Sequence, residues 1–197
     1  MYTSRLMAVV AAAILTAGGT PPQTPKSTAK PVAKAPLGRG AVVAQAHADI
    51  KGEGITGTAD FTEQKIGTVT TVEIGLTAKG LKPGFHGVHL HAVGTCEPDF
   101  AAAGGHFDPG PAGNMDPDAN YPFHMGDLPQ LMVGANGQGT LDAVTMRVTL
   151  SNGPLSLFDA DGSAIIVHGN PDPGITGEPR SGVSGGPRVA CGVIHKN

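Results

Sequence analysis

The segment "GFHGVHLH", residues 84–91, holds three of the eight histidines of this chain. Residues two apart in an extended strand point to the same face of the sheet, so the imidazoles of His89 and His91 would lie side by side. Imidazole nitrogens bind copper and zinc, and this spacing is suited to chelating one metal ion. Two ordinary surface histidines on a strand can have the same spacing, so the pair alone leaves both interpretations open.

Further side chains that can bind metal lie later in the chain. His106 and His124 fall in a Gly/Pro/Asp-rich segment, Asp127 comes three residues after His124, and His168 ends the apolar run "AIIVH". Histidine and carboxylate ligands together suit zinc. Only a fold can bring residues this distant together, so their spacing by itself does not define a site.

The rest of the chain predicts an all-β fold. The 30 glycines and 17 prolines separate short runs rich in Val, Ile, Thr and Ala, and no run has a helical period. The expected strands are residues 41–51, 55–62, 68–79, 86–91, 131–133, 139–145, 164–168 and 189–194. Eight short strands at this spacing predict an antiparallel sandwich or barrel. Two long segments without strands, 97–127 and 169–187, contain or border the candidate ligands and are expected to be functional loops.

The first forty residues predict an export signal and a tether. Residues 1–19 have the layout of a signal peptide, with Arg5, an apolar run and then small residues, and the run is too short to span a bilayer. A buried N-terminal helix is the alternative. Residues 20–40 contain five prolines, four basic residues and no acid, which predicts a disordered tether. The folded domain is expected over residues 41–197, in the periplasm, the cell envelope or outside the cell.

Charge and cysteine content narrow the function further. Residues 1–40 hold five of the 13 Lys and Arg and none of the 16 acids, which leaves a net charge of −8 beyond residue 40. This acidic balance argues against a nucleic-acid partner, so attraction for an anion would need a local group of cations. Cys96 and Cys191 in an exported chain predict one disulfide, with two buried free thiols as the alternative.

Five motifs carry a resemblance to a known family. "GFHGVHLHAVGTC", "GGHFDPG", "HMGDLP", "AIIVHGNPD" and "RVACGVI" resemble, in order and context, the copper,zinc superoxide dismutases, above all their bacterial exported branch. The resemblance covers about residues 41–194 and implies an eight-stranded Greek-key β-barrel, an immunoglobulin-like sandwich with two long loops around the metals. It implies conversion of superoxide to dioxygen and hydrogen peroxide by copper that alternates between Cu(II) and Cu(I). Copper and zinc are the implied cofactors, and a homodimer is one option for the assembly.

The resemblance also assigns metal ligands. It implies that copper is bound by His89, His91, His106 and His168. It places His106 between the two metals, as a catalytic residue that also carries a proton to the product. The implied zinc ligands are His106, His124 and Asp127.

Five more residues match positions with roles in the family. Arg188 matches the catalytic arginine that attracts and positions the anion beside copper. Asp172 matches a carboxylate that links imidazoles of the two metal sites, and such outer partners fix ring orientation. His86 matches a histidine that braces loop backbone, while Cys96 and Cys191 match the disulfide that ties the metal loop to the barrel.

One zinc ligand of the family is missing. Nine residues after His106, where relatives have a third zinc-binding imidazole, this chain has Met115. A thioether is a poor ligand for zinc but a good one for Cu(I). Three alternatives follow: Asp116 or Asp118 takes the place, zinc is bound weakly by three protein ligands and water, or the enzyme uses copper alone.

Two functions from different classes are therefore compared. The first is an exported superoxide dismutase. The second is a copper-binding or buffering module of the same fold with little turnover, which gains support from Met115. The presence of Arg188 favours the enzyme, because storage of copper has no need of an arginine that positions an anion.

Overall fold

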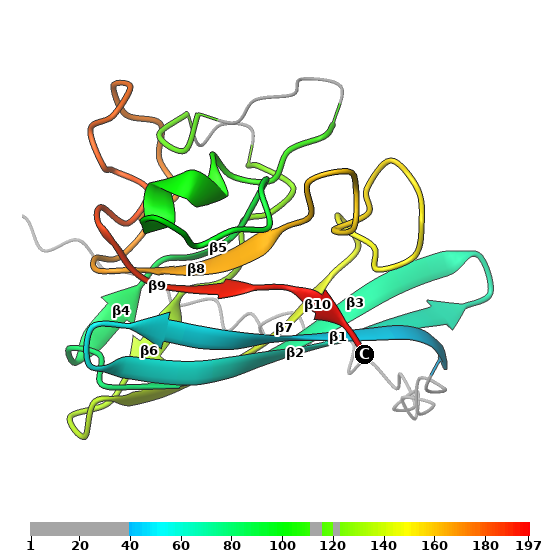
Figure 1. Ribbon diagram of the computed structural model, residues 1–197, viewed down its shortest axis with the longest axis horizontal. Coiled ribbons are helices and arrows are strands. Elements are labelled where there is room, and N and C mark those ends of the chain that lie inside the picture. Colours follow the sequence, from blue (N-terminus) through cyan, green and yellow to red (C-terminus); the bar gives the residue numbers. More distant parts are fainter. Residues whose placement is uncertain (1–39, 111–115, 120–122) are drawn as a thin grey trace, which may run out of the picture. The chain divides into compact units, whose positions relative to one another are not determined.

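The computed structural model describes residues 40–110, 116–119 and 123–197, and these fold into antiparallel strands with long connections (Figure 1). The predicted signal peptide and nearly all of the tether, as well as Met115, lie outside the described residues. The elements are β1 Ala41–Gly52, β2 Ile55–Ile66, β3 Val69–Lys79, β4 Gly84–His86, β5 Val88–His91, the 3₁₀ helix η1 Phe100–Ala103, β6 Leu131–Val133, β7 Gln138–Thr145, β8 Ala164–His168, β9 Arg188–Val193 and β10 His195–Lys196. No helix within the described ranges is long and apolar enough to cross a membrane.

The strand order closes the sheet into a barrel. Neighbouring strands follow the order β4-β6-β7-β3-β2-β1-β9-β8-β5, and β10 pairs with β1. The two strands at the ends of this order, β4 and β5, are consecutive in the chain and are joined by Gly87 alone. The sheet therefore curls until its two edges are almost in contact, which confirms the predicted antiparallel Greek-key barrel.

One expected strand, residues 86–91, is wrong in detail. It is two strands with different partners: β4 pairs with β6, and β5 pairs with β8. The chain changes partner at Gly87, where an added Cβ would lie 3.2 Å from Asp172 Cβ and 3.3 Å from His89 Cε1. Because the backbone stays extended through this change, the sequence pattern does not reveal it. With the short β10, the described residues form ten strands where eight were expected.

The barrel interior is filled by one face of each strand. Along β7, buried and exposed residues alternate without exception, and β3 alternates over most of its length, as expected for strands with one face in the core. Leu76 and Ile74 of β3 are 1 % exposed. Full burial of such a side chain stabilises the fold by about 1.5–3 kcal/mol relative to exposure.

Strand β8 is buried on both faces and supports the site. Ile165 and Val167 belong to the barrel core, whereas Ala164 and Ile166 pack in a second cluster with Cys191. The second cluster includes Ala103 at the end of η1, so the connection between β5 and β6 covers the outside of β8. In Figure 1 this connection (green) and the β8–β9 connection (orange) lie on the same side of β8.

Candidate metal centre

Four buried histidines from three parts of the chain meet over β5 and β8. His89 and His91 lie on β5, His168 ends β8, and His106 lies in the connection after η1. Their candidate ligand atoms all lie within 4.8 Å of one another. In β5 all four residues are buried, with Val88 and Leu90 in the barrel core and the two histidines on the opposite face. The structure thus brings together the four residues to which the resemblance assigned copper.

Hydrogen bonds fix the orientation of three of these rings. The bonds run from His89 Nε2 to Asp172 Oδ2 at 2.8 Å, from His91 Nδ1 to the Gly104 carbonyl at 3.0 Å, and from His168 Nδ1 to the Gly186 carbonyl at 3.1 Å. Since carboxylate and carbonyl oxygens only accept, each of these nitrogens carries the ring hydrogen and the other nitrogen keeps a free lone pair. Such partners are typical of histidines that bind a metal.

The remaining nitrogens fit a metal ion. His89 Nδ1 and the Nε2 atoms of His91, His106 and His168 are buried and have no hydrogen-bond partner among the described residues. A buried polar atom without a partner costs about 1–3 kcal/mol, and a cation that accepts the four lone pairs would remove this cost. Four imidazoles are ligands that suit copper.

Burial keeps these rings in the form that binds metal. It lowers the pKa of His91 well below 6.5, and the nearby His106 ring lowers it further. Burial likewise lowers the pKa of His106 to about 4 and that of His168 to about 3. The three rings are therefore neutral at neutral pH, with their lone pairs available.

A second group shares His106 with the first. The ligand atoms of His106, His124 and Asp127 lie within 4.8 Å of one another, and all three residues are buried. His106 Nδ1 is 2.8 Å from Asp127 Oδ1 and 3.2 Å from His124 Nδ1, while His124 Nδ1 is 3.3 Å from Asp127 Oδ2. His106 therefore faces this group through Nδ1 and the four-histidine group through Nε2. Two imidazoles and a carboxylate are ligands that suit zinc.

The electrostatics of the second group favour an ionised carboxylate. Burial raises the pKa of Asp127, but the hydrogen bonds to His106 and His124 outweigh it, and the pKa falls well below its usual range. For His124, burial lowers the pKa and Asp127 raises it, with a net rise above 6.5. The group is thus an anionic carboxylate beside two imidazoles, which is a favourable setting for a cation.

Arg147 holds the turn that carries two members of the second group, and sequence reasoning did not identify it. Its Nη1 donates to the His124 carbonyl at 3.2 Å, and its Nη2 donates to the Asp127 carbonyl. The backbone N–H of His124 also donates to Asp127 Oδ2 at 2.8 Å. No signal in the sequence points to Arg147, because its partners are backbone oxygens that any residues would supply.

Asp118 joins the two long loops and is in neither metal group. Its Oδ1 accepts from the backbone N–H and the hydroxyl of Ser184, both at 3.2 Å, and its Oδ2 accepts from Gly182 N–H at 3.1 Å. The Asp118 carbonyl accepts from Gly177 N–H at 2.8 Å. The carboxylate is thus directed at the β8–β9 loop, and a role as the substitute zinc ligand has no support in this arrangement.

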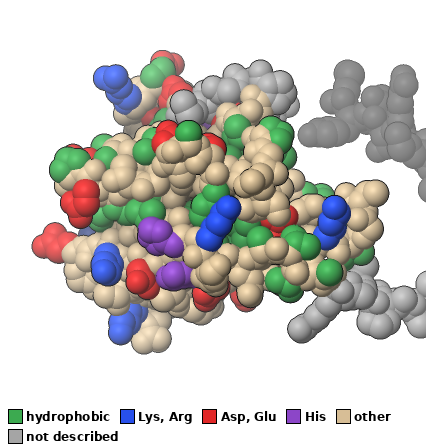
Figure 2. Space-filling model, turned by 45° about the vertical axis from the view of Figure 1, so that its right-hand side comes forward, with side chains coloured by type: hydrophobic (Ala, Val, Ile, Leu, Met, Phe, Trp, Pro, Cys, Tyr) green, Lys and Arg blue, Asp and Glu red, His purple; other side chains and the backbone are tan. Residues whose placement is uncertain are grey.

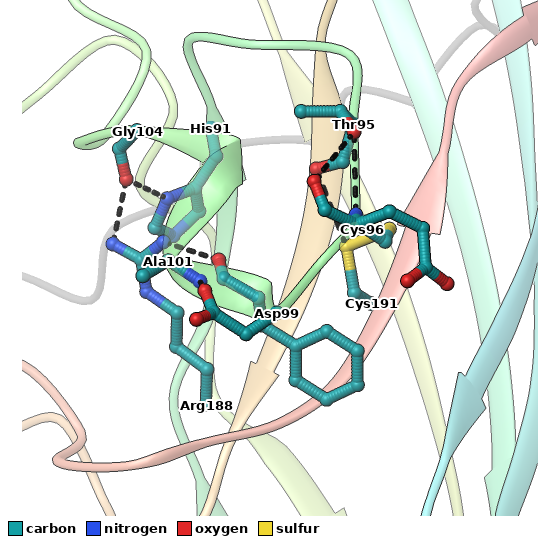
Figure 3. The surroundings of a disulfide bond; sticks show 10 residues. His91, Thr95, Cys96, Asp99, Ala101, Gly104, Arg188 and Cys191 are labelled. Atoms are coloured by element: carbon teal, nitrogen blue, oxygen red, sulfur yellow. Dashed lines mark hydrogen bonds between the residues drawn. A yellow bond between two sulfur atoms is a disulfide. The ribbon is translucent and has the colours of Figure 1, made fainter.

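Arg188 lies beside the four-histidine group, close to a disulfide (Figure 3). Cys96 and Cys191 form the predicted bond with a Cα–Cα distance of 5.9 Å, which links the β5–β6 connection to β9. Arg188 begins β9, and its two Nη groups donate to the carbonyls of Phe100 and Gly104, each at 2.6 Å. The disulfide and the arginine therefore hold the same connection from the same strand.

His86 is in neither metal group. Its Nδ1 lies 2.6 Å from the His168 carbonyl and its Nε2 lies 2.8 Å from the Lys82 carbonyl. Both ring nitrogens are thus engaged with backbone, in agreement with the bracing role that the resemblance implies.

The fold and the site together define a β-barrel protein with two adjoining groups of potential metal ligands that share one imidazole. The chain matches the family model described as copper/zinc superoxide dismutase (SODC) over residues 55–194. It is 40% identical over 144 residues to a Cu-Zn superoxide dismutase of Caulobacter vibrioides, a match that covers 70% of this chain and 77% of that protein. A Cu-Zn superoxide dismutase of Deinococcus radiodurans is 40% identical over 151 residues, with 71% and 77% covered. One from Brassica juncea is 38% identical over 146 residues, with 72% and 90% covered.

These matches extend over most of the barrel and both long loops. The chain belongs to the copper/zinc superoxide dismutase family. The family that the five motifs predicted is thereby confirmed, and copper and zinc are the cofactors that membership implies.

Proposed function

We propose that this chain performs superoxide dismutation with copper held by His89, His91, His106 and His168. Superoxide dismutase activity follows from its family and its curated relatives. One observation carries the residue assignment: four buried imidazole nitrogens without hydrogen-bond partners in the described residues, on rings whose ligand atoms lie within 4.8 Å of one another. Copper bound there would supply the one-electron oxidation and reduction that convert two superoxide anions and two protons to dioxygen and hydrogen peroxide.

His106 is suited to hold and release a proton. It is the one ring that belongs to both groups, and Asp127 holds its Nδ1 at 2.8 Å while Nε2 faces the other three histidines. If Nε2 takes up a proton, the contacts at Nδ1 keep the ring in place. Nε2 would carry this proton on the side of the ring that faces the four-histidine group, from which it could pass to the peroxide product.

Arg188 would attract the anion and position it. The two carbonyls that hold its guanidinium belong to the connection that covers β8, and the Gly104 carbonyl also orients His91. A positive charge is therefore fixed next to the four-histidine group, although residues 41–197 together carry a net charge of −8. A local positive charge of this kind raises the encounter rate with a small anion.

His106, His124 and Asp127 would hold zinc. A cation at this group would fix Nδ1 of His106 and so keep the ring oriented toward the four-histidine group. With Asp118 engaged by Ser184 and Gly182, the alternatives are a ligand from Asp116, weak zinc binding by three protein ligands, and an enzyme that uses copper alone.

Metal analysis combined with an activity assay tests these assignments. The protein is loaded with excess copper and zinc, dialysed against a weak chelator, and analysed for metal content and superoxide turnover in the same sample. One copper and one zinc per chain with fast turnover would support a functional zinc group despite Met115. One copper without zinc and with fast turnover would support the copper-only alternative.

The second candidate function is a copper-binding or buffering module, which Met115 favours. One copper per chain with negligible turnover would support it and contradict the catalytic roles of His106 and Arg188. Asp172 adds a further check, because its contact with His89 Nε2 orients a proposed copper ligand. Asp172→Asn should weaken copper binding in either case.

The proposed location is outside the cytoplasm, in the periplasm or cell envelope. The disulfide Cys96–Cys191 supports an oxidising compartment, and bacterial relatives fit an exported protein. Fractionation of cells that produce the full chain would test this, and recovery of the processed protein in the cytoplasmic fraction would contradict it. A homodimer stays one option for the assembly, which sedimentation analysis would measure.

A further inference from the structure

Two histidines lie outside the metal groups and face each other across a strand pair. His47 on β1 is the direct partner of His195 on β10. His195 is exposed and His47 half-buried, whereas the other six histidines are buried. Figure 2 shows histidine side chains (purple) next to each other on one face of the molecule, with an acidic side chain (red) beside them.

The rings of His47 and His195 are arranged like a pair inside the four-histidine group. The centroids of His47 and His195 are 6.3 Å apart and the rings are inclined by 49°. For His89 and His91 the same quantities are 6.3 Å and 50°. The separation and tilt of the surface pair therefore equal those of two imidazoles in the group to which copper is assigned.

A hydrogen bond prepares His47 for this role. Its Nδ1 lies 2.9 Å from Asn197 Oδ1, and because an amide oxygen only accepts, Nδ1 carries the hydrogen and Nε2 keeps its lone pair. Asn197 is itself held by its N–H, which donates to the Gln45 carbonyl at 3.1 Å. A ring that donates from one nitrogen to a fixed oxygen is the usual arrangement of a metal-binding histidine.

Carboxylates lie close enough in the sheet to assist. Asp60 is the β2 partner of His47, and Asp49, two residues from His47 on the same face of β1, lines one surface hollow together with His195. Of the two neighbouring cations, Lys196 is turned elsewhere, since its Nζ lies 4.7 Å from the centroid of the Phe158 ring, whereas Lys51 lines the hollow together with Asp49, Glu97 and His195. Three carboxylates, those of Asp49, Asp60 and Glu97, therefore lie around the pair against one lysine in the hollow. The surroundings of the pair thus favour a positive ion.

We propose that His47 and His195 form an additional, surface site for a divalent transition metal ion, with Cu(II) bound more tightly than Zn(II). The preference follows from the ligands, because nitrogen sites bind copper ahead of zinc. Two imidazoles and solvent would give a weaker and more open site than the buried groups. The inference does not depend on the superoxide chemistry, since none of its residues belongs to the buried groups.

Titration of the metal-loaded protein with Cu(II) tests the proposal. The buried groups are first filled with copper and zinc, loosely held metal is removed with a chelator, and CuSO₄ is added while heat and the electron paramagnetic resonance difference spectrum are recorded. One further equivalent should bind, with nitrogen couplings from two imidazoles. Loss of a residue that only orients a metal ligand weakens metal binding by about 10- to 100-fold. Because His47→Asn and His195→Asn each remove a ligand, each should weaken binding of the additional Cu(II) at least as much.

Lys196→Ala is the matched control, because it alters the same strand on the opposite face and should leave the additional equivalent intact. Superoxide turnover and the buried copper content should be equal in all variants, which shows that they are folded. The proposal is overturned if no further equivalent binds, or if the double variant His47→Asn/His195→Asn binds it as tightly as the parent protein. A Zn(II) affinity above that for Cu(II) would overturn the metal preference.

Discussion

Arg188 and His91 donate hydrogen bonds to the same acceptor, the carbonyl oxygen of Gly104, at 2.6 and 3.0 Å. The second Nη group of Arg188 is held by the Phe100 carbonyl at 2.6 Å. The position of the guanidinium is therefore coupled to the orientation of a ring in the four-histidine group. One backbone oxygen fixes both the guanidinium of Arg188 and the ring of His91, so a change in either residue should alter the position of the other.

Arg188→Ala should lower kcat/KM for superoxide by about 10-fold or more at low ionic strength, because electrostatic attraction of a small ion is worth about 10- to 1000-fold in rate. Its salt dependence should flatten as well, since the fixed charge that salt screens is gone. The measurement is kcat/KM over a range of ionic strength in samples of equal copper content. Lys79→Ala, which removes an exposed cation from β3, is the control. Unchanged low-salt rates in Arg188→Ala would contradict the proposed role.

Arg147→Gln should weaken zinc binding by about 10- to 100-fold while copper is retained, as expected for loss of a residue that positions metal ligands. The reason is that Arg147 holds the carbonyls of His124 and Asp127, and neither of these residues belongs to the proposed copper group. Zinc titration of the copper-loaded protein measures the effect. Arg147→Lys keeps the charge but cannot donate to two carbonyls from one planar group, so its zinc affinity should lie between those of the parent protein and Arg147→Gln. Equal zinc affinity in all three proteins would show that the turn holds its shape without Arg147.

Sequence patterns predicted the strands well because alternation and turn residues are local signals. The Val/Ile-rich runs before residue 80 correspond to β1, β2 and β3, and the alternation of His89 and His91 places both on one face of β5. The break at Gly87 escaped prediction, since it depends on which strands lie beside β4 and β5. The residues at the break do not show which distant strands will pair with β4 and which with β5.

The residues of the site also fall into a predicted and an unpredicted group. Motifs carried by resemblance pointed to His106, His168 and Arg188, although no spacing rule connects them. Arg147 and the link from Asp118 to the β8–β9 loop were not found, because their partners are mostly backbone groups of distant loops. Arg188 and His86 also bond to backbone carbonyls, and they were found only because they lie within motifs that carry the resemblance.

Replacement of both cysteines by serine, Cys96→Ser/Cys191→Ser, should lower the free energy of unfolding by about 4–5 kcal/mol, the chain-entropy value for so long a loop. The two residues are 95 apart in the chain. Activity should fall too, because the disulfide fastens to β9 the connection whose carbonyls hold Arg188. Denaturant unfolding and kcat/KM measure the two effects, and reduction of the parent protein should reproduce both. A serine variant as stable as the parent would show that loop packing alone holds this connection.

The metal-free protein should lose stability as pH falls from about 6.5 to about 4. Burial lowers the pKa values of His91, His106 and His168 in the folded state, to about 4 for His106 and about 3 for His168. The unfolded chain has histidine pKa values near 6.5, so between about pH 6.5 and pH 4 it binds more protons than the folded chain does. The free energy of unfolding therefore falls as the pH is lowered. Each such group contributes about 1.4 kcal/mol per pH unit.

His124 acts in the opposite direction, since its raised pKa adds stability below pH 6.5 and this contribution is lost as pH rises, but it is one group against three. Denaturant unfolding of the metal-free protein at a series of pH values measures the net slope. His168→Gln should reduce the slope, because it removes one of the three buried rings. A free energy of unfolding that stays constant from pH 7 to pH 4 would mean that the metal-free site opens and lets water reach these rings, in which case metal binding would have to close it.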